Sequence, residues 1–208
     1  MIDAIIRERR TTKALAESPL LVRDMVEEID AVVAAAGWAP FHRPAATRHR
    51  STLASPQPWR CYKLDAAGCR RLRERLLAAG DATKIPAMLA AASGLVLATW
   101  LPDPPQAPLP EGALFAPTLE NMEHLAAASA AIQNVLLAAT ARGMLSYWSS
   151  GGSLRAADSF AALGIPLEEL LLGAVFFFTG DLSGVPTKEG ALRDKRGALE
   201  DWSRWLDV

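Results

Sequence analysis

Five neighbouring residues near the start of the chain have side chains suited to holding a phosphate group. They are Arg9, Arg10, Thr11, Thr12 and Lys13, which together supply cations and hydroxyls. Guanidinium groups match phosphate oxygens in a bidentate fashion, a lysine adds a point charge, and hydroxyls donate further hydrogen bonds. A short basic run also occurs on ordinary solvated surfaces, so the meaning of this cluster depends on the rest of the chain.

The overall charge of the chain favours a small anionic ligand over a polyanion. The chain has 208 residues, of which 50% are hydrophobic, and a formal net charge of -1. It is long enough to bury a sizeable core, and no broad basic field indicates binding to nucleic acid or to a membrane. Cys61 and Cys69 have no CxxC or metal-ligand spacing, and no signal peptide is visible. We therefore expect a reduced, cytoplasmic protein.

Several common catalytic and cofactor motifs are missing from the sequence. It contains no GxGxxG fingerprint, no P-loop and no GxSxG elbow. Glu120, Glu123 and His124 have helical spacing, but no second set of metal ligands follows, so we interpret them as the solvated start of a helix. His42 follows Phe41 in a proline-rich loop, where it either lies on the surface or lines a pocket. The sequence thus predicts no metal site.

Two segments at the ends of predicted strands fit a planar ligand. Gln57 precedes the strand predicted for residues 59–64, and its primary amide offers both a donor and an acceptor to a heterocycle. Trp148, Ser149 and Ser150 end another predicted strand, and ligands bind at strand ends in open α/β sheets. An ordinary glycine-serine turn is an equally good interpretation of this second segment.

Hydrophobic periodicity predicts helices that alternate with strands. The predicted helices cover residues 3–8, 24–36, 66–79, 118–142 and 153–163, with a short helical piece from residue 85, and the strands cover residues 59–64, 94–101, 145–148 and 171–179. Residues 38–58 are largely loop, and residues 183–208 form a polar tail with an apolar end. This alternation predicts a layered α/β or α+β fold. The long alanine-rich helix and the tail indicate a dimer with an intertwined tail.

Four pieces of the sequence, in this order, resemble the FMN-dependent nitroreductase family. They are residues 9–13, residues 39–40 with residues 57–59, residues 131–139 with Gly143 and Trp148, and residues 163–166. The resemblance covers roughly residues 1–180. It implies an α+β fold of the α/β/α sandwich type, with helices on both sides of a mostly antiparallel sheet, in an intertwined homodimer with FMN at its interface. Residues 1–208 would form one domain, with an inserted loop at 41–56 and a C-terminal extension at 183–208.

The resemblance also implies which residues hold the FMN phosphate and ribityl chain. By the family's motif these are Arg9, Arg10, Thr11 and Lys13. A basic residue after the last strand often completes the phosphate site. We assign Arg196 to this role, with Arg193 and Lys195 as the alternatives.

A second set of residues is implied to lie near the flavin ring. Gln57 would lie close to the ring, and Trp148, Ser149 and Ser150 would approach it from another strand end. Trp38 and His42 resemble a branch of the family in which the residue at the histidine position faces the flavin.

The activity implied by the resemblance is that of an FMN-dependent NAD(P)H oxidoreductase. It would pass electrons by a ping-pong mechanism from NADH or NADPH to a nitroaromatic, a quinone or a similar small acceptor. Because the flavin carries the chemistry, no side chain is assigned a catalytic role. The loop at 41–56 departs from the family's pattern, since it is basic and has no asparagine ahead of Gln57. This departure leaves two alternatives: an FMN carrier or redox sensor without efficient turnover, and a specialised flavin dehydrogenase or dehalogenase.

Overall fold

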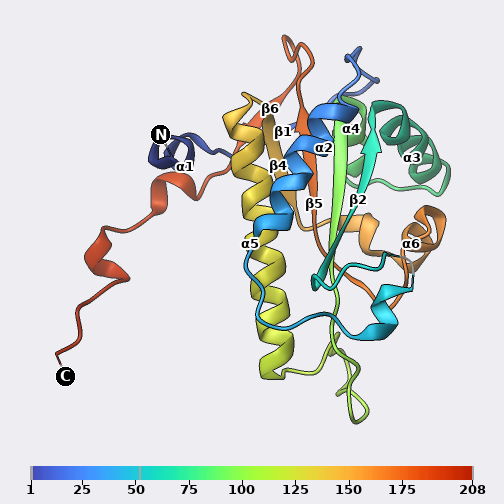
Figure 1. Ribbon diagram of the computed structural model, residues 1–208. Helices are drawn as coiled ribbons and strands as arrows, with labels where there is room; N and C mark the ends of the chain where they lie inside the picture. Colours follow the sequence, from blue (N-terminus) through green and yellow to red (C-terminus); the bar gives the residue numbers. More distant parts are fainter. Residues whose placement is uncertain (1, 52, 208) are drawn as a thin grey trace.

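A four-stranded antiparallel sheet lies at the centre of the structure, a computed structural model that describes residues 2–51 and 53–207 (Figure 1). Its strands, in spatial order, are β2 (Trp59–Asp65), β3 (Gly94–Trp100), β5 (Leu170–Phe178) and β4 (Leu145–Ser149). All three pairings are antiparallel. The four strands predicted from the sequence are therefore confirmed, and their ends differ from the prediction by one residue.

The alternation of side chains along the two central strands produces a core on each face of the sheet. Successive residues of a strand point to opposite faces. Val96 of β3 and Phe177 of β5 belong to one buried cluster, whereas Leu97 and Phe176 belong to the other. Every residue of β3 is buried, as expected for a strand that is covered on both faces.

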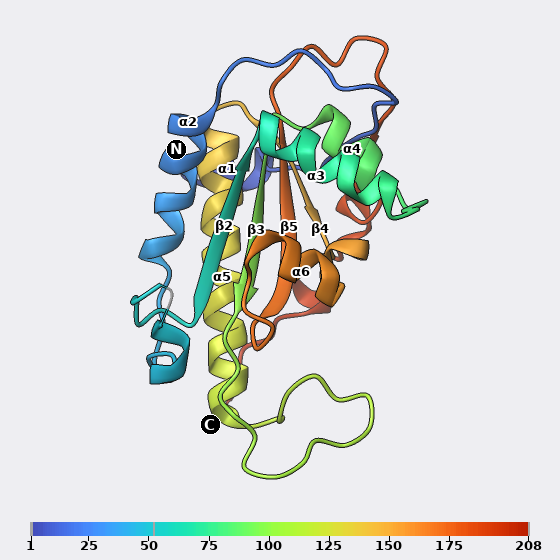
Figure 2. The same ribbon diagram turned by 90° about the vertical axis from the view of Figure 1, so that its right-hand side faces the viewer.

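Helices cover both faces of this sheet (Figure 2). Helices α2 (Val26–Ala34) and α5 (Leu119–Ala141) lie on one face, and α3 (Ala66–Ala78), α4 (Ile85–Ala91) and α6 (Ala157–Leu163) lie on the other. The predicted α/β/α sandwich, with helices on both sides of an antiparallel sheet, is confirmed. The proline-rich segment between β3 and α5 projects beyond the end of the sheet in both views.

The long helix α5 is fixed at its start by a side-chain cap. The Thr118 hydroxyl accepts a hydrogen bond from the backbone N–H of Asn121 at 3.2 Å, which satisfies one free donor of the first turn. Its inner face, which includes Ile132 and Val135, is buried against the sheet. By length and composition alone this helix is apolar enough to cross a membrane, but the core helix of a globular protein meets the same criterion.

Two predicted helices begin later than the sequence pattern indicated. The helix predicted for residues 153–163 is wrong in its first part, because Gly152–Arg155 forms a 3-10 turn and the extended backbone of Ala156 separates that turn from α6. Ser153 does not cap α6, since its hydroxyl donates to the Asp81 carboxylate. The helix predicted for residues 24–36 begins at Val26 and ends in a 3-10 turn, Ala35–Trp38.

Two short strands that the sequence pattern did not predict join the two ends of the chain. Strand β1 (Thr12–Ala14) follows helix α1 (Ile2–Glu8) and pairs antiparallel with β6 (Thr187–Glu189). Thr11 also forms a single bridge with Ser146 of β4. The polar tail therefore returns to the basic cluster before it runs away from the sheet on the side of α1 (Figure 1).

Candidate functional site

A cavity of about 410 Å³ lies between the basic cluster, the end of β4 and the returning tail. It is lined by Arg9, Arg10, Thr11, Tyr147, Trp148, Glu189, Gly190, Ala191, Leu192, Arg193 and Arg196. Residues almost 190 positions apart in the sequence thus meet in one site. The cavity contains five of the residues assigned to the cofactor, namely Arg9, Arg10, Thr11, Trp148 and Arg196.

The pairing of β1 with β6 positions the tail at this cavity. Thr12 is the register partner of Glu189, and the Gly190 N–H donates to the Thr11 carbonyl oxygen at 2.9 Å. Arg193 then donates to the Arg9 carbonyl oxygen at 2.8 Å and to the Arg7 carbonyl oxygen. These backbone contacts fix the tail at the C-terminal end of α1, so the tail arginines come to lie beside the first cluster.

The charged residues that line the cavity are mostly positive. Four of its lining residues are arginines, and the pKa of Arg9 is lowered by burial first and then by the nearby charges of Arg196 and Arg193. Like charges that are held together in this way repel one another unless an anion lies between them. The site is therefore suited to an anion that accepts several charged hydrogen bonds.

One carboxylate partly balances this charge. Glu189 Oε1 lies 3.4 Å from Arg10 Nη1, and both side chains are more than half exposed. Arg9 Nη1 lies 3.5 Å from the Thr11 hydroxyl oxygen, which is a weak hydrogen bond. Sequence reasoning missed Glu189, because one acidic residue in a polar tail looks like an ordinary solvated charge.

Trp148 supplies an aromatic wall to the cavity. Its indole lies so close to Gly173 of β5 that a β-carbon there would be 1.9 Å from the indole Nε1. The missing side chain at position 173 therefore sets where the indole lies. Tyr147, the next residue, also lines the cavity and was not assigned to the site from the sequence.

Three assigned residues near Trp148 do not line the cavity in this chain. The Lys13 ammonium lies 4.9 Å from the centre of the Tyr147 ring, in a cation–π contact. The buried Ser149 hydroxyl accepts a hydrogen bond from the Gly151 N–H at 3.1 Å. Ser150 is exposed, and its carbonyl oxygen accepts a bond from Arg155. The assignment of Lys13, Ser149 and Ser150 to the cofactor stays a prediction.

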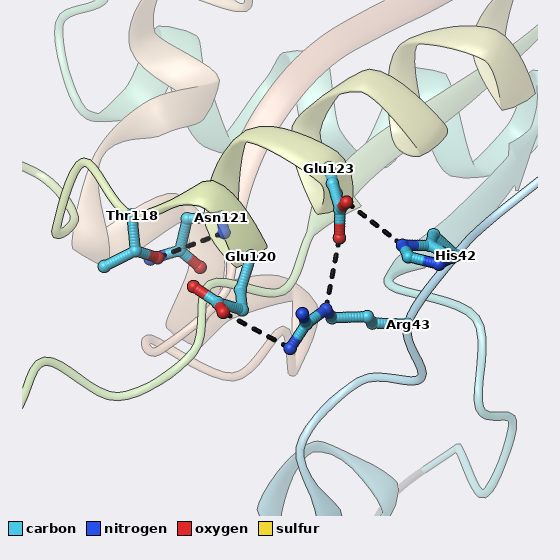
Figure 3. Close-up of polar contacts among 6 residues, drawn as sticks. All are labelled: His42, Arg43, Thr118, Glu120, Asn121 and Glu123. Carbon is cyan, nitrogen blue, oxygen red and sulfur yellow. Dashed lines mark hydrogen bonds and ion pairs between the residues drawn. The ribbon is translucent and has the colours of Figure 1, made fainter.

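His42 lies at a different place, beside the first turns of α5. Its Nδ1 is 3.0 Å from Glu123 Oε1 (Figure 3). The neighbouring Arg43 forms ion pairs with Glu120 at 3.2 Å and with Glu123 at 3.3 Å. Glu120 and Glu123 are thus partners of this loop, and no group of three His, Cys, Asp or Glu side chains that could hold a metal ion occurs within residues 2–51 and 53–207.

The loop around His42 forms one wall of a second, largely apolar cavity of about 430 Å³. Phe41 and His42 face Ala127 and Ala130 of α5 across it. Trp38, next to this loop, is 88% exposed, which is unusual for a large aromatic side chain. Neither His42 nor Trp38 is among the described residues that line the arginine-rich cavity.

Gln57 lies two residues ahead of β2, also outside the arginine-rich cavity. Its side-chain oxygen is buried and has no hydrogen-bond partner among the described residues. A buried acceptor without a partner costs free energy.

The inserted loop at 41–56 is held by a buried arginine. Arg60 of β2 donates from Nη2 to the carbonyl oxygens of His49, Leu53 and Ser55 at 2.8–3.0 Å. From Nη1 it donates to the carbonyl oxygen of Gln57 at 2.8 Å. One side chain therefore fixes the backbone of the insertion and of Gln57 together.

A buried carboxylate lies near Arg60 and was also missed from the sequence. Glu169 is 4% exposed and accepts hydrogen bonds from the Tyr62 hydroxyl at 2.8 Å and from the Thr99 hydroxyl. Burial raises the pKa of Glu169, and these hydrogen bonds together with the charge of Arg60 oppose that rise. An acidic residue directly ahead of the apolar strand β5 is the sequence signal that could have indicated it.

Comparison with known proteins agrees with this architecture. The model of the nitroreductase family matches residues 6–178. No curated protein matches the chain in sequence. The nitroreductase-like family protein from Bacillus cereus is similar in structure, with 20% identity, a TM-score of 0.67, and coverage of 100% of this chain and 97% of that chain.

Two further solved structures are similar over the whole chain. Nitroreductase CinD from Lactococcus lactis, solved with nicotinic acid and with chloramphenicol, has 18% identity, a TM-score of 0.65, and coverage of 100% of both chains. The FMN-dependent nitroreductase NfnB from Mycobacterium smegmatis, solved with NADPH, has 17% identity, a TM-score of 0.61, and coverage of 99% of this chain and 97% of that chain. At these identities the likeness establishes a shared fold.

Proposed function

Since this chain belongs to the nitroreductase family, we propose that it is an FMN-dependent NAD(P)H oxidoreductase that acts on a nitroaromatic, a quinone or a similar small acceptor. The observation that carries this proposal is the arginine-rich cavity, in which burial and then the charges of Arg196 and Arg193 lower the pKa of Arg9. A phosphate monoester is the ligand that such a cluster fits best.

The described residues fit FMN in charge, shape and chemistry. The cavity volume of about 410 Å³ is within the range of roughly 300–1,000 Å³ that is typical of small-molecule sites. Arg9 and Arg196 would hold the phosphate, and Thr11 would donate to its oxygens or to the ribityl chain. Trp148, at the same cavity, would pack against the flexible chain or the ring. When bound, FMN supplies the hydride and electron transfer that no side chain of this protein can perform.

We propose that the complete site requires a second copy of the chain. Trp38, His42 and Gln57 do not line the arginine-rich cavity, although Trp38 is largely exposed and the Gln57 side-chain oxygen is buried without a partner among the described residues. In a homodimer, these three residues of one copy would lie over the flavin held by the other. Trp38, which is 88% exposed in the single chain, would then become buried at the interface.

The solved relatives support the choice of cofactor and reductant. NfnB is an FMN-dependent nitroreductase that was solved with NADPH, and CinD was solved with nicotinic acid, a pyridine ring like that of the nicotinamide cofactors. A reductant of the same class fits the proposed reaction, in which the reductant leaves before the acceptor binds. The loop at 41–56, which Arg60 holds in place, and Trp38 would then shape the part of the site where the acceptor binds.

The proposal is tested first by the absorption of the purified protein. We expect the visible bands of bound flavin, in about one equivalent per chain, and bleaching of these bands when NADH or NADPH is added without oxygen. A protein that isolates with flavin which neither nucleotide reduces would contradict the reductase activity. Protein that takes up no FMN would contradict the cofactor assignment itself.

Turnover separates the proposed enzyme from the two alternatives. An FMN carrier or sensor would be reduced without sustained oxidation of NAD(P)H in the presence of a quinone. A specialised dehydrogenase or dehalogenase would be fully reduced but slow with both quinone and nitroaromatic acceptors. Sedimentation of the same preparation measures the oligomeric state, and a monomer with full activity would contradict the shared site.

A further inference from the structure

The arginine-rich cavity contains a carboxylate that opposes the proposed ligand. Glu189 is the one acidic side chain among the described residues that line the cavity, against four arginines. It pairs with Arg10 at 3.4 Å. A phosphate that entered the cavity would be repelled by the Glu189 carboxylate. It would also find Arg10, one of the cations that could bind it, already paired with that carboxylate.

The backbone holds Glu189 in this place. Strand β6 pairs Glu189 with Thr12, and the next residue, Gly190, donates to the Thr11 carbonyl oxygen at 2.9 Å. These backbone contacts fix the position of residue 189 at the rim of the cavity. Its ion pair is nevertheless easy to exchange, because an exposed pair contributes little free energy.

Arg10 and Glu189 also line a neighbouring cavity of about 540 Å³. That cavity is lined by the threonines Thr12, Thr140 and Thr187 as well. The Thr140 hydroxyl already donates to the Leu136 carbonyl oxygen at 2.9 Å, but Thr187 and Glu189 are exposed. A carboxylate displaced from Arg10 is therefore solvated by water, and its release from the pair leaves no buried charge without a partner.

We propose that Glu189 is a specificity-determining residue that competes with the ligand's phosphate for Arg10. In the empty site the carboxylate occupies the guanidinium, and a doubly charged phosphate monoester displaces it. The affinity of the site for phosphate is therefore lower than its four arginines alone would give. This inference rests on the proposed function, because the phosphate in question is that of FMN.

The test compares FMN with riboflavin, which has the same ring system and no phosphate. In the full-length protein freed of flavin, Glu189→Gln is expected to tighten FMN binding by about fivefold, the value of an exposed ion pair that the phosphate no longer has to break. Riboflavin binding should change by less than about twofold, since riboflavin has no phosphate that competes with Glu189 for Arg10. The gain should shrink at high salt, because salt screens exposed charges.

Glu8→Gln is the matched control. Glu8 lines the neighbouring cavity but not the arginine-rich one, so this variant removes the same charge at a similar place without freeing Arg10. An equal gain in Glu8→Gln would show a general field effect and overturn the competition. Unchanged or weaker FMN binding in Glu189→Gln would also overturn it, since Glu189 would then serve to orient Arg10.

A second pair of variants tests whether Arg10 is the contested group. In an Arg10→Gln background, the gain from Glu189→Gln is expected to disappear, and a gain of the original size would contradict the proposal. The failure of the proposed function looks different: wild-type protein would then bind FMN no more tightly than riboflavin, or would bind neither.

Discussion

The indole of Trp148 occupies the space in which a side chain at Gly173 would lie, with Nε1 1.9 Å from the position of the missing β-carbon. Non-bonded atoms do not approach this closely, so the indole of Trp148 and a β-carbon at position 173 cannot both occupy these positions. Trp148 is also a wall of the arginine-rich cavity. The smallest residue of strand β5 thus determines the shape of a site whose lining residues come from other elements.

Gly173→Ala should move the indole of Trp148 into the cavity. We expect FMN affinity to fall by about tenfold and the free energy of unfolding to fall by about 1–3 kcal/mol, because extra atoms in a packed region force neighbouring groups to shift. Fluorescence quenching by FMN and urea unfolding measure the two effects. Gly37→Ala, where a β-carbon would meet no atom within 4 Å, is the control for stability, and equal losses in both variants would refute the steric explanation.

Arg9 and Lys13 are expected to differ in their importance for the cofactor. Arg9 lines the cavity, so Arg9→Gln should weaken FMN binding by about 10- to 100-fold, the value of one charged hydrogen bond. The Lys13 ammonium lies over the Tyr147 ring, and we expect Lys13→Gln to cost less than about threefold. Arg23→Gln, outside the site, is the matched control. Equal losses for Arg9 and Lys13, measured by flavin titration, would mean that lysine turns toward the phosphate on binding.

Arg60→Lys should loosen the inserted loop while it keeps the positive charge. A lysine has three donors and cannot reach all of the carbonyl oxygens that Arg60 binds. We expect a loss of about 2–4 kcal/mol in the free energy of unfolding and faster hydrogen exchange within residues 49–57. Arg71→Lys, on the exposed face of α3, controls for the substitution. Unchanged exchange in the loop would show that other contacts suffice to hold it.

Stability should depend on pH through Glu169. Burial raises the pKa of this carboxyl in the folded protein, so the folded state binds more protons than the unfolded chain between the ordinary and the raised value. The extra proton binding of Glu169 in the folded state adds to the free energy of unfolding. This contribution is complete below the ordinary carboxyl pKa and is lost as pH rises through the folded pKa. Urea midpoints between about pH 4 and 8 should therefore fall more steeply in wild type than in Glu169→Gln. The exposed Glu27→Gln variant should retain the wild-type slope, and a slope shared by all three proteins would assign the effect to another group.

The sequence predicted those parts of the fold that depend on local patterns. The largely apolar strands β3 and β5 follow from their uncharged runs, and the α5 helix between Thr118 and Gly143 follows from its periodicity and helix-end signals. The helix start predicted at Ser153 was wrong because that hydroxyl has a distant partner, Asp81, which no local pattern records.

The sequence indicated the basic residues of the candidate site but not how they are arranged in space. The type and spacing of Arg9, Arg10 and Thr11 indicated an anion site, and the structure brings them together with Arg196. The role of Glu189 was missed because it depends on the register of β1 and β6. Strands of three residues leave almost no periodic signal, and their pairing is decided by contacts far apart in the chain.

The pairing of β1 with β6 also has a consequence for the order of events during synthesis. The Arg10–Glu189 contact joins positions 179 residues apart, so it forms only after nearly the whole chain has left the ribosome. The central sheet is complete once Phe178 has emerged, 15 residues before Arg193, the first of the tail arginines that line the cavity. At roughly 5–20 residues per second, a nascent chain would have all its core strands while the phosphate cavity still lacks one wall. Capture of the cofactor would then follow formation of the central sheet.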